Sequence, residues 1–222
     1  MDNIEIIPAV LETKFIKIQE KLKKLEPYFD KVQIDIGDGK FVSDKFGCID
    51  KLREFKTKIL IEVHLMTEKP WEDLEFLKNE NIKKITFHYE SFLRIPKKTR
   101  SFAINNLIKR IKEMGMKVGI AINPETGTGF IADYLERIDE VLLLSVVPGK
   151  QGQKFEEEVL SKVRLLRNIK EDLTVGVDGG ISDKNIEKII DTGINKAYIG
   201  SFLWKEGSLE SLLRKLKIEQ QT

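Results

Sequence analysis

Short apolar runs rich in isoleucine and valine alternate with longer amphipathic stretches along the whole chain. The amphipathic stretches, such as residues 14–29 and 154–170, carry apolar residues at every third or fourth position and charges between them, which predicts helices. The apolar runs are short and repeatedly separated by such helices, which predicts parallel strands. The eight predicted strands are Glu5–Val10, Lys31–Ile36, Ile59–Leu65, Ile82–Phe87, Lys117–Ile122, Glu140–Ser145, Thr174–Val177 and Lys196–Ile199.

Eight units of strand and helix favour a closed barrel, whereas open doubly wound sheets commonly stop at five or six strands. No proline-rich or serine-rich linker interrupts the alternation. We therefore expect residues 1–222 to form one domain of the α/β class, a (β/α)8 TIM barrel. In such a barrel the carboxyl ends of all strands share one rim, and the loops that leave this rim build the active site.

Polar residues stand at this predicted rim, whereas the strand bodies are predicted to be apolar. Asp35 in VQIDIGDG and Asp178 in VGVDGG each end a β-branched run and enter a glycine turn, and His64 ends the run ILIEVHLM. The two aspartates predict a two-carboxylate active site. If the strand ends converge, Asp35, His64 and Asp178 form a cluster able to hold a metal. For each residue alone a structural role is the alternative, and His88 is left open between the two roles.

Glycines gather in the last loops of the predicted barrel. Their backbone N–H groups can surround an oxyanion, and the loops after strands seven and eight are where this architecture most often holds phosphate. These loops contain no arginine, so we expect amides and a helix dipole to bind the phosphate rather than charged side chains. Any one of these glycines alone would indicate only a turn. The residues are Gly149, Gly152, Gly179, Gly180 and Gly200, followed by Ser201.

Composition narrows the class of partner. The chain has 38 Lys and Arg against 36 Asp and Glu, a net charge of +2, so no strong field attracts nucleic acid or a membrane surface. We expect a small-molecule partner, no nucleic acid and no membrane. The single cysteine, Cys48, excludes an internal disulfide, and the first residues lack the pattern of a secretory signal. These features predict a cytoplasmic protein.

Several segments occur in an order and spacing that resembles the ribulose-phosphate 3-epimerase family over nearly the whole chain: IIPAVLETKF, DIGDGKFV, EVHLM, ITFHYES, LSVVPGKQGQKF, VDGGI and AYIGS. The resemblance implies a metal-dependent isomerase of the pentose phosphate pathway. Such an enzyme converts D-ribulose 5-phosphate to D-xylulose 5-phosphate by two-base proton transfer at carbon 3, through a metal-stabilised enediolate.

The resemblance also implies roles for individual residues. Asp35 and Asp178 correspond to the acid and base pair, and with His64 they would hold a divalent metal ion, whether zinc, iron, manganese or magnesium. The loop Pro148–Gln153 would close over a small phosphosugar substrate. The implied substrate-binding residues are His64, Met66, Gly149, Gly152, Gly179, Gly180, Gly200 and Ser201.

The chain departs from the family pattern at positions near this chemistry. Gln33 replaces a histidine that serves as a metal ligand, and an amide oxygen is a poorer ligand for zinc or iron than imidazole. Glu12 replaces a serine, and we consider two hypotheses: Glu12 supplies a carboxylate that compensates for Gln33, or it points away from the site. Gly37 and Leu144 replace two methionines, and Val147 replaces an asparagine.

Other functions stay open at this point. An epimerase of a hexulose 6-phosphate such as allulose 6-phosphate is one alternative, and a non-catalytic phosphosugar-binding relative with an eroded metal site is another. A decarboxylase is disfavoured, because related barrel decarboxylases carry Asp-x-Lys where this chain has Asp35-Ile36-Gly37. A homo-oligomer is compatible with the sequence.

Overall fold

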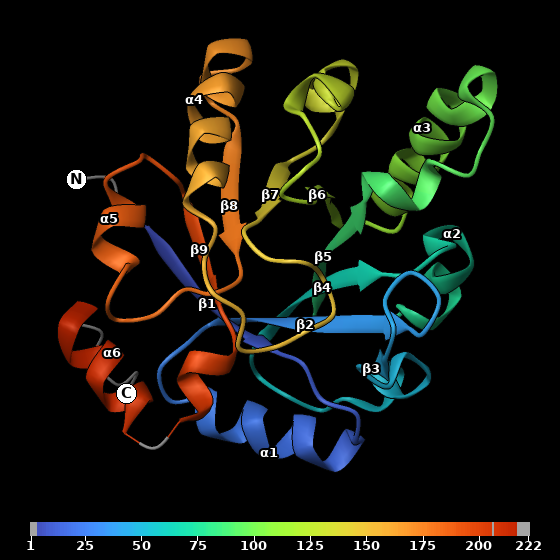
Figure 1. The fold of residues 1–222 in the computed structure, drawn as a ribbon. Coiled ribbons are helices and arrows are strands. Elements are labelled where there is room, and N and C mark those ends of the chain that lie inside the picture. Colours follow the sequence, from blue (N-terminus) through green and yellow to red (C-terminus); the bar gives the residue numbers. More distant parts are fainter. Residues whose placement is uncertain (1–3, 206, 217–222) are drawn as a thin grey trace.

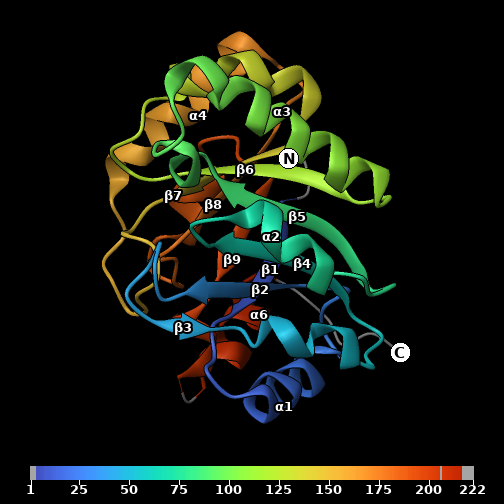
Figure 2. The same ribbon diagram turned by 90° about the vertical axis from the view of Figure 1, so that its right-hand side faces the viewer.

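The computed structural model, which describes residues 4–205 and 207–216, is a closed barrel of parallel strands with helices outside it (Figures 1 and 2). Neighbouring strands pair in chain order, and β1 pairs with both β2 and β9, which closes the barrel. The predicted (β/α)8 fold and all its predicted strands are confirmed, with ends that differ by no more than two residues. The strands are β1 Glu5–Val10, β2 Lys31–Asp38, β4 Leu60–Met66, β5 Ile82–His88, β6 Lys117–Ile122, β7 Glu140–Leu144, β8 Thr174–Asp178 and β9 Lys196–Ile199.

The connections are less regular than the strands. A two-residue strand, β3 (Lys45–Phe46), lies antiparallel to β2 outside the barrel, and it is followed only by a 3-10 helix. The segment after β6 also forms 3-10 helices, because Pro124, Gly127 and Gly129 disfavour a regular α-helix there. The α-helices are α1 Phe15–Leu25, α2 Pro70–Asp73, α3 Lys97–Glu113, α4 Leu160–Ile169, α5 Ile186–Ile190 and α6 Ser208–Leu216. None of the helices within the described ranges is long and apolar enough to cross a membrane.

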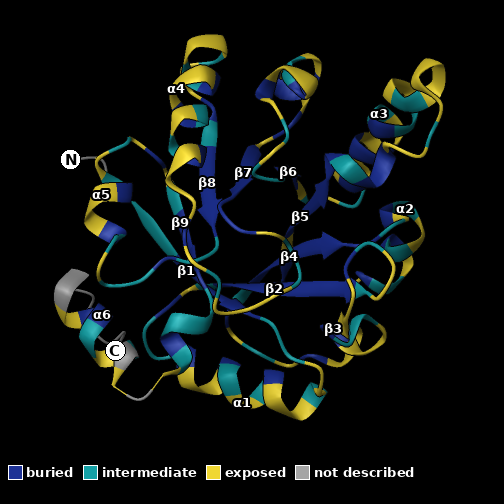
Figure 3. Cartoon of the chain, in the orientation of Figure 1, coloured by how far each residue is buried: buried dark blue, intermediate teal, exposed yellow. Residues whose placement is uncertain are grey.

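Apolar side chains pack on both faces of the barrel wall. The strands are buried along most of their length, whereas the helices expose their outer faces (Figure 3). Successive side chains on a strand point to opposite faces, so Ile34, Val63 and Ile85 pack outward under the helices. A second, smaller cluster fills the inside of the barrel. This alternation aims the other residues of β2, β4 and β8 into the barrel interior. The inner cluster consists of Ile7, Ala121, Leu142, Leu144 and Tyr198.

Charged residues occupy the barrel interior near the amino-terminal ends of the strands, where the sequence predicted only apolar strand bodies. The Lys84 ammonium lies 2.6 Å from carboxylate oxygens of both Glu62 and Glu140, and the Lys196 ammonium lies 2.8 Å and 2.9 Å from the same two side chains. Lys84 also donates to the Tyr198 hydroxyl at 2.5 Å. Burial alone would raise the pKa of Glu62, but the two lysines outweigh it and lower that pKa to about 2. The prediction of apolar strand bodies is therefore wrong at this end.

Candidate active site

Asp35, His64 and Asp178 meet at the carboxyl end of the barrel. The register of β2 with β4 places Asp35 beside His64, and barrel closure brings in Asp178 from β8. His64 Nδ1 lies 3.1 Å from Asp35 Oδ1 and 3.8 Å from Asp178 Oδ2. One ligand atom from each of the three residues lies within 4.8 Å of the others. The predicted convergence of the two aspartates and His64 is confirmed.

Gln33 lies two residues before Asp35 on β2, so both side chains point into the barrel, and Gln33 links the two aspartates. Its Nε2 donates to Asp35 Oδ1 at 2.9 Å and to Asp178 Oδ2 at 2.6 Å. Its Oε1 is buried and has no hydrogen-bond partner. A buried acceptor without a partner is unfavourable by about 1–3 kcal/mol, which indicates that something outside the chain completes this site.

The electrostatics of the cluster favour a cation. Burial raises the pKa of Asp35 to about 7, and burial together with the charge of Asp35 raises the pKa of Asp178 to about 7. Burial lowers the pKa of His64 to about 4, so its ring is neutral near pH 7 and can offer a lone pair. Two adjacent buried carboxylates are both ionised only when a positive charge compensates them.

These residues fit a divalent metal ion. They supply two carboxylates and an imidazole nitrogen in one buried cluster, which is a ligand set used for zinc, iron, manganese and magnesium. Gln33 turns its NH2 group to the carboxylates, so its oxygen joins this set only if the amide is turned over. Within the part of the chain that the structure describes, Asp35, His64 and Asp178 form the group of acidic and imidazole side chains placed closely enough to hold an ion.

The predicted substrate-binding residues line the pocket that contains this cluster, although their roles stay predictions. The pocket also includes residues that sequence reasoning missed, among them Ala9 and Leu11 from β1 and the loop that follows it. Lys150, from the segment VPGKQGQ, is a lining residue as well, and our expectation that backbone amides bind the phosphate stays a prediction. The predicted residues in the lining are His64, Met66, Gly149, Gly152, Gly179, Gly180, Gly200 and Ser201.

Side chains hold the turn after β8 by donating to the carbonyl groups of both of its glycines. Gly179 and Gly180 have φ angles of +110° and +59°, in the region that favours glycine. The Ser145 hydroxyl donates to the Gly179 carbonyl at 2.6 Å, and the Asn185 amide donates to the Gly180 carbonyl at 3.0 Å. These bonds fix the backbone of the turn, as a site that binds an anion through backbone N–H groups requires.

Replacing Gly180 by alanine is expected to raise KM for a phosphosugar by roughly tenfold, equivalent to about 1.4 kcal/mol, with a smaller effect on kcat. The added Cβ would lie 2.5 Å from Phe155 N and 2.7 Å from Phe155 Cα, so the turn must move. Steady-state kinetics measures the effect. Gly193→Ala is the matched control, because Gly193 also has a positive φ of +81° but nothing within 4 Å of the added Cβ. Equal KM values for both variants would contradict the role of the turn.

The loop between β7 and α4 lies over the pocket. It passes across the strand ends in the centre of Figure 1 and contributes lining residues from Pro148 to Gln153. Gln151 Nε2 donates to the Leu11 carbonyl at 2.7 Å, which ties this loop to the one after β1. Gly149 packs against Val42, where a Cβ would lie 2.6 Å from the Val42 Cβ. The loop therefore covers the cavity, as its resemblance to a closing loop implied, whereas its movement stays a prediction.

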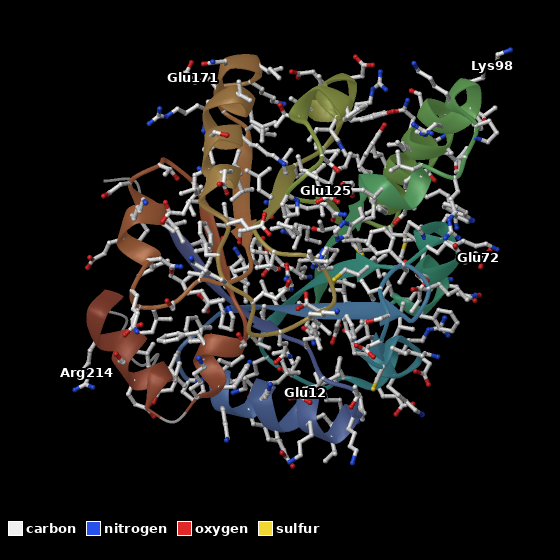
Figure 4. All side chains as sticks on the ribbon, viewed as in Figure 1. Glu12, Glu72, Lys98, Glu125, Glu171 and Arg214 are labelled. Atoms are coloured by element: carbon white, nitrogen blue, oxygen red, sulfur yellow. The ribbon has the colours of Figure 1, made fainter. Side chains whose placement is uncertain are left out.

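Glu12 does not contact the cluster. Its carboxylate binds the Lys21 ammonium at 2.7 Å, and that ammonium lies 4.1 Å from the centre of the Trp204 ring. Figure 4 shows Glu12 above α1. The structure therefore favours the hypothesis in which Glu12 points away over the one in which it compensates for Gln33. The glycine at position 37, in place of the methionine of the family pattern, also has a structural reason. A Cβ there would lie 2.5 Å from the Phe46 ring of β3.

Comparisons with known proteins point to one family. Residues 5–204 match the model of the Ribulose-phosphate 3 epimerase family. The ribulose-phosphate 3-epimerase of Schizosaccharomyces pombe is 30% identical over 223 residues, covering 98% of this chain and 94% of the relative. That of Buchnera aphidicola subsp. Baizongia pistaciae is 34% identical over 229 residues, covering 98% and 96%.

Solved structures support the fold. The 3-hexulose-6-phosphate synthase from Salmonella typhimurium matches with a TM-score of 0.68 at 15% identity, covering 96% of each chain. The orotidine 5'-monophosphate decarboxylase from Sulfolobus solfataricus matches with a TM-score of 0.57 at 14% identity, again covering 96% of each chain. At these identities the likeness concerns the barrel alone. With the family model matched over residues 5–204 and relatives above 30% identity, the chain belongs to the ribulose-phosphate 3-epimerase family.

Proposed function

We propose that the protein is an isomerase that interconverts D-ribulose 5-phosphate and D-xylulose 5-phosphate by moving a proton at carbon 3. The observation that supports this most directly is the meeting of Asp35 and Asp178 beside His64 in a pocket ringed by glycine turns. The relatives bear the name of this activity, and they match the chain over nearly its whole length. A non-catalytic relative would have little use for two buried carboxylates in contact with one amide.

Asp35 and Asp178 are proposed as the two proton-transfer groups. Inversion at carbon 3 requires removal of the proton on one face and its return on the other, so one carboxyl group must stand on each side of the substrate. A carboxylate with an ordinary pKa of about 4 is a weak base for a proton next to a ketone. Without an ion, burial raises the pKa of both groups to about 7, which makes each a stronger base than an exposed carboxylate.

Asp35, His64 and Asp178 are proposed to hold a divalent metal ion, with the oxygen of Gln33 as a further ligand once the amide is turned over. A bound cation would stabilise negative charge that develops on the substrate oxygens. The residues themselves orient the ligand atoms and exclude water, because all of them are buried or nearly so. Three of the four ligand atoms are oxygens, a set that favours manganese or magnesium over zinc.

Replacing Gln33 by histidine is expected to raise the affinity for Zn²⁺ by about tenfold or more, because imidazole binds zinc better than an amide oxygen does. Competition with a zinc chelator measures this affinity. Gln151→His is the matched control, since Gln151 lines the same pocket from the covering loop but lies outside the cluster. An unchanged zinc affinity in Gln33→His would show that residue 33 does not reach the ion.

The turns after β8 and β9 are proposed to bind the phosphate. Gly179, Gly180, Gly200 and Ser201 offer backbone N–H groups there, and Lys150 supplies a positive charge from the covering loop. Small phosphosugars are therefore the proposed substrates. The cytoplasmic location and a homo-oligomeric state stay predictions.

The test is proton exchange in deuterated water with ribulose 5-phosphate, run with and without added Mg²⁺ or Mn²⁺. Deuterium at carbon 3 of both epimers is the expected result, and allulose 6-phosphate in a parallel reaction compares the hexulose alternative. If no deuterium enters the pentulose under any metal condition, the proposed activity is wrong. Faster exchange into the hexulose would reassign the substrate while keeping the reaction type.

A further inference from the structure

A second histidine stands directly behind His64. His88, the last residue of β5, is completely buried, and its Nε2 lies 2.9 Å from His64 Nε2. The two rings stack with centroids 5.0 Å apart and an interplanar angle of 21°. His64 therefore has one nitrogen, Nδ1, facing the carboxylates and the other facing His88.

A carboxylate holds the far side of His88. His88 Nδ1 lies 3.3 Å from Glu90 Oε2. The other oxygen of Glu90 accepts the backbone N–H of Asn123 at 2.9 Å and the hydroxyl of Thr126. Both oxygens of Glu90 thus act as acceptors, and the carboxylate is fixed between the ends of β5 and β6.

This chain of contacts dictates where each proton lies. Glu90 can only accept, so His88 must carry a proton on Nδ1. A neutral His88 then has an unprotonated Nε2, which accepts a hydrogen bond from His64 Nε2–H. With a cation bound, the Nδ1 of His64 is consequently left as a lone pair, directed at the site between Asp35 and Asp178. Without a cation, Asp35 Oδ1 lies 3.1 Å from this nitrogen, already accepts from Gln33 and draws the proton of His64 to Nδ1.

We propose that His88 and Glu90 are positioning residues that fix the tautomer of His64, with its proton on Nε2 and its Nδ1 free to bind a cation. The proposal rests on the proposed function in treating His64 as a metal ligand. It adds that Glu90, acting through His88, fixes the proton position of His64 on the side away from the metal. Partners of this kind commonly change metal affinity by about 10- to 100-fold.

The competing arrangement is a charged His88 that donates from both nitrogens. It would donate to Glu90 and to His64 Nε2, so the proton of His64 would move to Nδ1 and point at Asp35. In that case Nδ1 has no lone pair for a metal. The two arrangements differ at three of the four ring nitrogens, all except His88 Nδ1, which makes them distinguishable by spectroscopy.

The chain contains only two histidines, so nitrogen-15 NMR of the imidazole rings reports on His64 and His88 alone. The spectrum is recorded on the full chain at about pH 8, above the ordinary histidine pKa of about 6.5, with and without the diamagnetic probe Zn²⁺. A His64→Gln variant assigns the signals. The expected result in the presence of Zn²⁺ is protonation at Nε2 of His64 and at Nδ1 of His88.

Glu90→Gln is the informative variant, because an amide has the shape of the carboxylate but offers one acceptor and one donor. The N–H of Asn123 and the hydroxyl of Thr126 require the acceptor, so the NH2 group must face His88 and donate to its Nδ1. Both tautomers are then reversed, and zinc affinity is expected to fall about 10- to 100-fold. Asp139→Asn is the control: its carboxylate also accepts a β6 backbone N–H, that of Val118 at 2.8 Å, but at the opposite end of the barrel.

Protonation of His64 at Nδ1 in the zinc-loaded wild-type chain would overturn the proposal, and so would a Glu90→Gln variant with wild-type tautomers and zinc affinity. The wild-type spectrum decides the matter even if that variant does not fold. A failed deuterium exchange assay would reject the proposed function without altering these spectra, so the two hypotheses are tested separately.

Discussion

An Asp178→Asn variant is expected to lose at least about a thousandfold in kcat for the interconversion of ribulose 5-phosphate and xylulose 5-phosphate, in both directions. Asparagine keeps the shape of aspartate, and its oxygen can still accept from Gln33, which contacts Asp178 at 2.6 Å. It cannot take or return a proton. Because each direction of an inversion uses both carboxyl groups, the loss should not depend on which epimer is supplied. A coupled assay run from each epimer measures the effect.

Binding separates a lost proton-transfer group from a collapsed site. Calorimetry with the phosphosugar should show that Asp178→Asn still binds it, because the glycine turns are unchanged. Asp133→Asn is the control, since Asp133 is exposed and does not line the pocket. A variant at position 178 that retains activity within tenfold of the wild type would defeat the two-base assignment, whatever its affinity.

The strands and the rim could be predicted because both leave a local record in the sequence. A buried parallel strand is a short run of β-branched residues, and its end is marked by the first polar residue before a glycine turn, as in VDGG. Once eight such strands are recognised, closure places Asp35, His64 and Asp178 on one rim whatever their separation in the chain. The structure agrees at each of these positions.

The contacts between side chains could not be predicted in the same way. Gln33 and Glu12 both stood near the predicted site, but only the side-chain directions show that Gln33 bonds both aspartates while Glu12 pairs with Lys21. The same limit applied to His88. Its motif indicated a strand end, whereas its role depends on a ring 2.9 Å away on another strand.

The charges inside the barrel were missed for a related reason. Glu62 stands inside an apolar run, whereas Lys84, Glu140 and Lys196 stand at or near the start of one, which by itself resembles a solvated strand edge. Only the closed barrel brings two acids and two bases together out of water. Gly176 helps to make room for them, because a Cβ there would lie 2.7 Å from the Tyr198 ring.

Replacing Lys84 by methionine is therefore expected to lower the free energy of unfolding by about 3–5 kcal/mol. The methionine fills most of the space of the lysine side chain but leaves Glu62 and Glu140 with Lys196 as their one remaining close cation. A buried carboxylate without a compensating charge destabilises the folded state by far more than the apolar contacts of the methionine stabilise it. Urea unfolding followed by circular dichroism gives the midpoint and the slope, and a lower midpoint at unchanged slope would show a true loss of stability.

A second substitution tests whether charge, rather than packing, causes this loss. Lys84→Met combined with Glu140→Gln restores balance, since Glu62 and Lys196 then remain as a pair 2.8 Å apart. The double variant should be more stable than Lys84→Met alone, although Glu140→Gln by itself removes a buried partner of both lysines and should destabilise the protein. Additive losses would instead mean that the four residues act independently. The rescue, if observed, would show that these four charged side chains stabilise the barrel interior together, as one neutral group beneath Gln33 and His64.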